Sequence, residues 1–236
     1  MITRVNELRH RLRFRLWTAW LAFQLRRRGA RLVVDAPFGA RMDSWPHVDV
    51  ADGVESFTLR VARGVKLGRA THLDLQPGAA VLEIGEGAYF MHGVRLQLRG
   101  GAIRLGAYVN LRDGVVLKSE GELDIGYEVP VSYGCAIHCV ERITIDASAG
   151  LAERVTVVDS DHTHDGTDAY FLANPLKVAP VHIGSNAFLC ANAVVTRGAN
   201  IGANSVVAAN AVVGEGDHPP GWLLAGVPAR PVRPLG

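Results

Sequence analysis

An aliphatic residue recurs every six positions near the carboxyl end of the chain. The recurring residues are Ile183, Leu189, Val195, Ile201, Val207 and Val213. A helix repeats its apolar face about every 3.6 residues and a strand every 2, so a spacing of six fits short strands that end at corners. Small or turn-forming residues occupy most of the remaining positions and allow sharp turns. The pattern predicts an all-β solenoid whose coils are each closed by three short strands.

A weaker form of the same pattern extends toward the amino end. Each expected coil begins with an aliphatic residue followed by glycine or aspartate, at Leu67, Ile84, Leu105, Ile125, Ile145, Ile183 and Ile201. The steps are 17, 21, 20, 20, 38 and 18 residues, and the step of 38 holds one coil and an excess between Val158 and Pro180. We therefore expect about seven coils over residues 49–218, a loop at about 158–180, and a tail at 219–236.

Residues 3–27 show a helical period instead. The expected apolar stripe consists of Val5, Leu8, Leu12, Leu16, Ala19 and Phe23, and it predicts an amphipathic α-helix. Residues 29–48 contain Pro37, Gly39 and Pro46 and are expected to form an irregular connection, so that residues 1–48 make one amino-terminal unit.

The amino-terminal helix has two possible roles. Its apolar run, residues 16–25, is shorter than the roughly 20 residues that cross a bilayer, and it lacks a signal-peptide cleavage site. The helix either covers the open end of the solenoid, or it lays Trp17, Trp20 and its arginines on an anionic membrane surface. The expected location is the cytoplasm, with the inner face of the membrane as the alternative.

The charge of the chain is unevenly distributed. Its 236 residues carry a net charge of +2, but residues 1–28 hold eight arginines and one glutamate, or +7, which leaves 2 − 7 = −5 for the rest. This body does not suit nucleic-acid binding. Cys135, Cys139 and Cys190 have no metal-ligand spacing and are expected to be reduced. No metal site is predicted.

Three sequence features point to a known family. They are the hexapeptide array, the ending Asp-His-Pro-Pro-Gly-Trp-Leu-Leu-Ala-Gly-Val-Pro-Ala-Arg at 217–230, and the segment 143–157 followed five residues later by His162. With them, residues 125–236 resemble the left-handed β-helix acyltransferases, in particular the galactoside, maltose and polysaccharide O-acetyltransferases. The run at 161–166 is also similar to the equivalent region of xenobiotic acetyltransferases of this fold.

The resemblance implies a left-handed parallel β-helix and a homotrimer, with acetyl-CoA in a groove between neighbouring subunits. It assigns His162 as the general base and Ser132 as a contact of the acceptor. The donor-binding positions that it implies are Phe188, Ala191, Ala209, Arg230 and Arg233. Phe188 stands where many members have tryptophan. Residues 214–216, Gly-Glu-Gly, replace the Thr-Lys pair that usually precedes the closing turn, so one donor contact departs from the family.

The chemistry of these residues fits acyl transfer. Attack of a hydroxyl on a thioester requires removal of the hydroxyl proton, which a neutral imidazole performs near cellular pH. We therefore predict an acetyl-CoA-dependent O-acetyltransferase that acts on a sugar or polysaccharide-precursor hydroxyl, with His162 as base and His164 as the alternative. The imidazole needs an orienting partner, and the candidates are Asp159, Asp161, Glu141 and a backbone carbonyl.

Other functions remain open at this point. A γ-carbonic-anhydrase-like metalloenzyme would share the β-helix, but it needs three converging histidines, and the close pair here is His162 and His164. A serine or xenobiotic acetyltransferase of the same fold would differ in its acceptor. A non-catalytic or ice-binding solenoid would favour a threonine-rich face, and this chain has few threonines. His72, His92, His138 and His182 are expected to lie at the surface or at corners.

Overall fold

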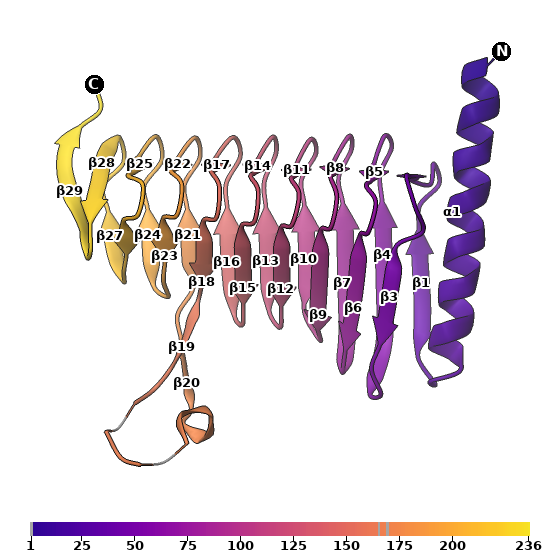
Figure 1. Cartoon of the computed structure of the whole chain (residues 1–236), viewed down its shortest axis with the longest axis horizontal. Helices are drawn as coiled ribbons and strands as arrows, with labels where there is room; N and C mark the ends of the chain where they lie inside the picture. The colour runs from indigo at the N-terminus through magenta and orange to yellow at the C-terminus, as the bar shows by residue number, and fades with distance from the viewer. Residues whose placement is uncertain (1, 165, 169) are drawn as a thin grey trace.

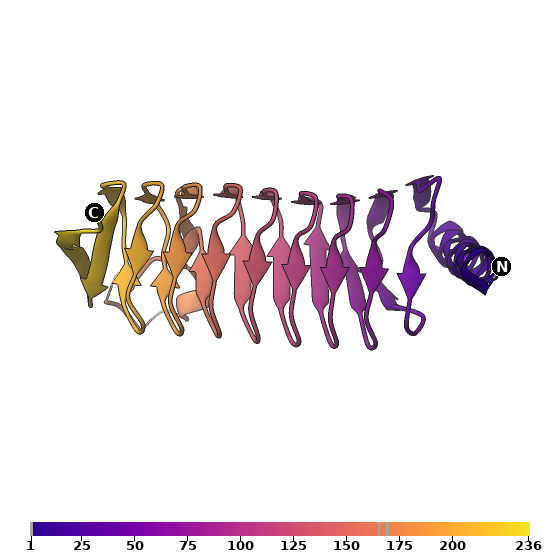
Figure 2. The same ribbon diagram turned by 90° about the horizontal axis from the view of Figure 1, so that it is seen from above.

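The chain folds into a β-solenoid with an α-helix at one end. The structure is a computed structural model that describes residues 2–164, 166–168 and 170–236, with side chains described except at 2–6 and 171. Figure 1 shows the coils stacked along the long axis, with helix α1 (Ile2–Arg26) beside the first coil. The view in Figure 2, turned by 90°, also places the helix against the end of the stack.

Three parallel sheets run along the solenoid, and each coil visits them in the order A, B, C. Sheet A contains β1 (Arg31–Asp35), β4 (Val54–Val61), β7 (Gly78–Ile84), β10 (Ala102–Leu105), β13 (Glu122–Ile125), β16 (Arg142–Ile145), β21 (Val181–Ile183), β24 (Ala199–Ile201) and β27 (Gly216–His218). Sheet B contains β2 (Arg41–Met42), β5 (Lys66–Leu67), β8 (Tyr89–Phe90), β11 (Asn110–Leu111), β14 (Pro130–Val131), β17 (Gly150–Leu151), β22 (Phe188–Leu189), β25 (Val206–Val207), β28 (Trp222–Gly226) and the antiparallel β29 (Ala229–Pro234). Sheet C contains β3 (His47–Val50), β6 (His72–Gln76), β9 (Arg95–Arg99), β12 (Val116–Ser119), β15 (Ala136–Cys139), β18 (Thr156–Val158), β23 (Val194–Val195) and β26 (Val212–Val213).

The aliphatic residues of the hexapeptides form the core of the solenoid, as predicted. Ile183, Leu189 and Val195 are fully buried, and Leu189 lies in register between Leu151 and Val207 of the adjacent coils. The corners are made by residues that tolerate a left-handed backbone: Asn186, Asn192, Asn204 and Asn210 have φ between 55° and 60°. The prediction of a parallel β-solenoid is therefore confirmed.

The solenoid has nine coils rather than the expected seven, because sheet A has nine strands. The additional coils lack the pair of an aliphatic residue and a glycine or aspartate that marks the other coils. The second coil ends its sheet A strand with Val61-Ala62, and the ninth places His218 in register with Ile201. The expected coil start at Leu67 is also wrong, since Leu67 belongs to sheet B.

The expected irregular connection at 29–48 is also corrected. Residues 31–50 supply β1, β2 and β3, which pair with strands of the second coil, so the first coil begins at Arg31. Pro37, Gly39 and Pro46 lie between these strands and not within them. Residues that usually interrupt regular structure therefore mark corners here, because a solenoid needs a turn after every short strand.

Helix α1 is found where the sequence predicts it, but it buries a different face. Its buried residues are Phe14, Trp17, Leu21 and Leu25, each at most 2% exposed. The expected stripe faces outward: Leu8, Leu12, Leu16 and Phe23 are 53–71% exposed, Ala19 is exposed, and Val5 lies outside the described side chains. At 3.6 residues per turn the two sets lie on opposite sides of the helix. The helix thus has two apolar stripes.

The inner stripe of α1 covers the open end of the solenoid. It belongs to the same buried cluster as Leu59 and Leu67 of the coils, and the indole Nε1–H of Trp17 donates a hydrogen bond to the Pro46 carbonyl at 3.3 Å. The first of the two predicted roles is therefore observed. Within the described residues, no helix combines the length and the apolarity that crossing a membrane requires.

Candidate active site

A hairpin leaves the solenoid at the corner that follows β18. Its strands are β19 (Ser160–His162) and β20 (Leu176–Val178), which pair antiparallel, and a 3₁₀ turn, η1 (Phe171–Ala173), lies near its tip. Figure 1 shows the hairpin projecting well beyond the outline of the coils. The predicted loop at 158–180 is thus an ordered pair of strands at its base, which gives the side chains of β19 a defined position.

Asp159 anchors the base of this hairpin. Its side chain is fully buried and accepts hydrogen bonds from the backbone N–H groups of Val140, Glu141 and Arg142, at 2.8, 2.8 and 2.9 Å. Both carboxylate oxygens are therefore directed toward the previous coil. This corrects the suggestion that Asp159 orients the imidazole of His162: it fixes the point from which the hairpin starts.

His162 ends β19 and is half-buried, whereas His164, two residues later, is exposed. The Nδ1 atom of His162 lies 3.4 Å from the backbone carbonyl oxygen of Asn174. Next to it, the Thr163 hydroxyl donates a hydrogen bond to the carbonyl of Pro175 at 3.0 Å. A backbone carbonyl, one of the orienting partners that the sequence allows, therefore lies beside His162.

The hairpin and the solenoid enclose a hollow of about 470 Å³. It is lined by Asp161, His162, Thr163, His164, Lys177 and Arg197. Arg197 forms an ion pair with Asp161 at 3.0 Å and a second one with Glu215 at 2.8 Å. Lys177 faces Asp161 across the hairpin register. Sequence reasoning missed Lys177 and Arg197, because their nearness to His162 follows from the pairing of β19 with β20 and from the next coil.

The predicted donor-binding residues lie together along sheet B and its corner with sheet C. Phe188 is 46% exposed and pairs with Val206. Val206 pairs with Leu223, and Leu223 with Arg233, so one row of sheet B connects Phe188 to Arg233. Ala191 and Ala209 occupy the corner after β22 and β25, where the Asn210 N–H donates to the Ala191 carbonyl. Arg230 is exposed on β29.

Ser132 does not join His162 within one chain. It lies at the corner between sheets B and C, where its hydroxyl donates a hydrogen bond to the Glu153 carboxylate at 2.9 Å. The hairpin of His162 leaves from the corner between sheets C and A. The predicted donor-binding residues and Ser132 therefore share one edge of the solenoid, and the predicted base occupies another.

Comparisons with known proteins agree with the repeat architecture. Residues 180–215 match the family model described as "Hexapeptide repeat of succinyl-transferase". No curated protein matches the chain.

Several solved structures are similar to this chain. A maltose O-acetyltransferase from Clostridium difficile 630 has 22% identity and a TM-score of 0.46, covering 65% of this chain and 69% of its own. A point mutant of AntD, an N-acyltransferase from Bacillus cereus in complex with dTDP and coenzyme A, has 15% identity and a TM-score of 0.44. The match covers 60% of this chain and 73% of the AntD chain. The polySia-specific acetyltransferase NeuO has 16% identity and a TM-score of 0.39. The match covers 87% of this chain and 81% of the NeuO chain.

Proposed function

We propose that this protein is an acetyl-CoA-dependent O-acetyltransferase that acts on a hydroxyl of a sugar or polysaccharide precursor, with His162 as general base. The observation that carries the proposal is the ordered hairpin, which holds a half-buried histidine beside a hollow large enough for a small acceptor group. Catalytic groups commonly project on such segments from a rigid scaffold. The row of sheet B that links Phe188 to Arg233 provides an exposed surface for the acyl donor.

The geometry at His162 suits proton abstraction. A proton on Nδ1, directed at the Asn174 carbonyl oxygen, leaves Nε2 as the basic atom of the imidazole. Nε2 takes the proton of the acceptor hydroxyl as its oxygen bonds to the thioester carbon. When the tetrahedral intermediate collapses, the carbon–sulfur bond breaks, the thiolate of CoA leaves, and the imidazolium returns the proton to it. Products are the acetyl ester and free CoA.

The separation of the two edges supports a proposed homotrimer. Within one chain, His162 and the donor-binding row belong to different corners of the coil. A neighbouring copy that packs beside sheet C would place its hairpin next to the donor-binding edge of the first, so that each site would draw on two chains. In this arrangement Ser132 of one subunit and His162 of another would share one site.

Two histidine variants test the catalytic assignment. His162→Ala is expected to lower kcat for acetyl transfer by about 10²–10⁴-fold, the usual cost of losing a general base, while binding of acetyl-CoA persists. His164→Ala is the matched control, because it removes an exposed imidazole from the same hollow, and it should be much milder. The activity of both variants is measured as the release of the free thiol of CoA from acetyl-CoA in the presence of a panel of acceptors. If His164→Ala is the inactive variant, or if both remain active, this base assignment is wrong.

We also propose that α1 attaches the protein to an anionic membrane surface. The outer stripe, defined as Leu8, Leu12, Leu16 and Phe23, is exposed, and the exposed Arg9, Arg11, Arg15 and Arg27 flank it on the helix. This arrangement is typical of helices that lie in a lipid interface. The local charge of +7 favours anionic headgroups and opposes the pairing of two such helices.

Vesicle sedimentation tests this attachment. The intact chain should bind vesicles containing phosphatidylserine and not vesicles of phosphatidylcholine alone, and added salt should weaken the binding. Leu12→Glu together with Leu16→Glu should abolish it, whereas Val227→Glu, a change at a 72% exposed valine outside the helix, should not. Equal binding by all three proteins would exclude the outer stripe as the contact. Loss of self-association in the Leu12→Glu/Leu16→Glu variant would identify a second copy as the occupant instead.

A further inference from the structure

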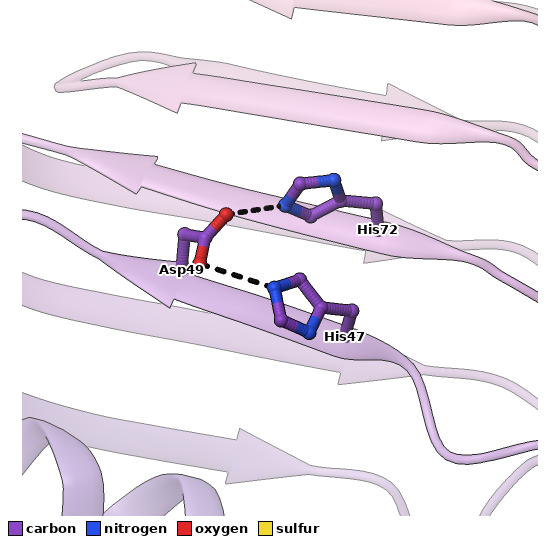
Figure 3. A group of neighbouring side chains, drawn as sticks. All are labelled: His47, Asp49 and His72. Carbon is purple, nitrogen blue, oxygen red and sulfur yellow. Dashed lines mark hydrogen bonds and ion pairs between the residues drawn. The ribbon is translucent and has the colours of Figure 1, made fainter.

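Two histidines and one aspartate converge on the outer face of sheet C near the amino end. Figure 3 shows the imidazoles of His47 and His72 facing the Asp49 carboxylate, one ring beside each oxygen. The Nε2 atom of His47 lies 3.1 Å from Oδ1 of Asp49, and Nε2 of His72 lies 2.8 Å from Oδ2. One ligand atom from each residue lies within 4.8 Å of the other two.

The strands dictate this convergence. His47 and Asp49 are two residues apart on β3, so their side chains emerge on the same face. β6 follows β3 in the sheet, and its register sets His72 directly beside His47. The two imidazole rings meet edge to face, with centroids 4.8 Å apart. Residues 25 positions apart in the chain thus form one cluster across the first two coils.

The ion pairs described for Asp49 are those with the two histidines. Asp74 lies in register with Asp49 one coil further on, but its carboxylate accepts hydrogen bonds from Gln76 at 2.6 Å and from Gln97 at 2.7 Å. Arg95, the residue in register with His72, lies 3.5 Å from the Asp74 carboxylate. Arg95 is therefore paired with Asp74, and the Asp49 carboxylate is paired with the imidazoles. Arg28 lines the same hollow as Asp49.

We propose that His47, Asp49 and His72 form a binding site for a divalent transition metal ion of the zinc type. Imidazole nitrogen and carboxylate oxygen are common ligands of Zn²⁺, whose bonds to them of about 2.0–2.2 Å put tetrahedral ligand atoms roughly 3.3–3.5 Å apart. The spacings of 3.1 and 2.8 Å involve the two different oxygens of Asp49, and one ligand atom from each of the three residues lies within 4.8 Å of the other two. Rotation of the exposed side chains would bring these atoms to the tetrahedral spacing. The sequence predicted no metal ligands, because the register of β3 with β6 is not visible in it.

The exposure of the cluster determines what kind of site it is. The side chains of His47 and Asp49 are 67% and 56% exposed, so solvent water is available to complete the coordination. Asp49 also lines a hollow of about 380 Å³ that Trp20 and Gln24 of α1 border. A metal ion bound here joins the first coil to the second, beside the helix that covers them. Its expected effect is to stabilise this end of the solenoid.

The site is independent of the proposed acetyl transfer. In sheet C, β6 is separated from β18, the strand that precedes the catalytic hairpin, by β15, β12 and β9. Metal binding is therefore measured directly, without an activity assay. Co²⁺ is the probe, since its visible absorption reports a protein-bound ion, and displacement by Zn²⁺ reports the affinity for zinc.

The protein, freed of metal with a chelator, should bind one Co²⁺ per chain, and Zn²⁺ should displace it and raise Tm. Loss of a partner that only orients a metal ligand costs about 10–100-fold in affinity, so losing a ligand, in His72→Ala or Asp49→Asn, should cost more than this. His182→Ala is the matched control, because it removes an imidazole that contacts Asp146 at 2.9 Å on sheet A, and it should bind Co²⁺ like the parent.

Asp49→Asn keeps the shape of the side chain, so it still tests the proposal if His72→Ala fails to fold. The proposal would be overturned by any of three results. These are an unchanged Co²⁺ affinity in Asp49→Asn, a loss of Co²⁺ affinity in His182→Ala equal to that in the site variants, and no Co²⁺ bound by the parent.

Discussion

At the scale of single residues, burial controls the reactivity of the cysteines. Burial raises the pKa of the Cys135 thiol to about 11 and that of Cys139 to about 12. Because the thiolate is the reactive form, neither residue should react with an alkylating reagent near neutral pH in the folded protein. Mass spectrometry after labelling, compared with a denatured control, checks this. Labelling of Cys139 as fast as in the denatured chain would show that the coil around it opens.

The guanidinium of Arg230 offers a second prediction for a single residue. It is exposed on β29, in the strand pair that extends the proposed donor-binding row of sheet B. If it holds a CoA phosphate, Arg230→Ala should raise KM for acetyl-CoA by about tenfold with a smaller effect on kcat, because phosphate binding is equal in the ground and transition states. Arg69→Ala, at an exposed corner of the amino-terminal half, is the control. An unchanged KM would leave Arg230 without this role.

At the scale of elements, helix α1 shows why an apolar pattern does not determine which face is buried. Its inner stripe packs on the end of the solenoid, and its outer stripe is exposed. Trp17→Ala should therefore destabilise the protein by about 3–5 kcal/mol, as for other large buried residues. Leu12→Ala, at a residue 58% exposed, should leave stability nearly unchanged. Thermal unfolding followed by circular dichroism compares the two, and equal losses would contradict the orientation of the helix.

The hairpin is the other element on which the proposed function depends. Its location was predictable, because the step of 38 residues is the one large interruption of the repeat. The pairing of β19 with β20 was not, since this segment has no hexapeptide pattern. The base of the hairpin is also held by residues of the previous coil, namely the three backbone N–H groups at 140–142 that donate to Asp159.

At the scale of the whole molecule, a single solenoid keeps its predicted functional residues on separate edges. We therefore expect a homotrimer, and light scattering should give about three times the chain mass of 25.4 kDa. A matched test mixes inactive His162→Ala subunits with subunits inactivated at Ser132. If one site draws on two chains, mixed trimers should regain part of the activity. A stable, active monomer would contradict both the trimer and the shared site.

The sequence by itself determined the hexapeptide core, the small corner residues and the place of the hairpin with His162. Each of these is encoded by the spacing of neighbouring residues, because every coil repeats the same local turn. Tertiary structure alone decided that Asp35 lies in a coil, that Val61 and His218 end strands of sheet A, that α1 buries Phe14 and Trp17, and that His47 meets His72. These depend on the register between coils and on packing at the end of the stack, where residues far apart in the chain compete for the same contacts.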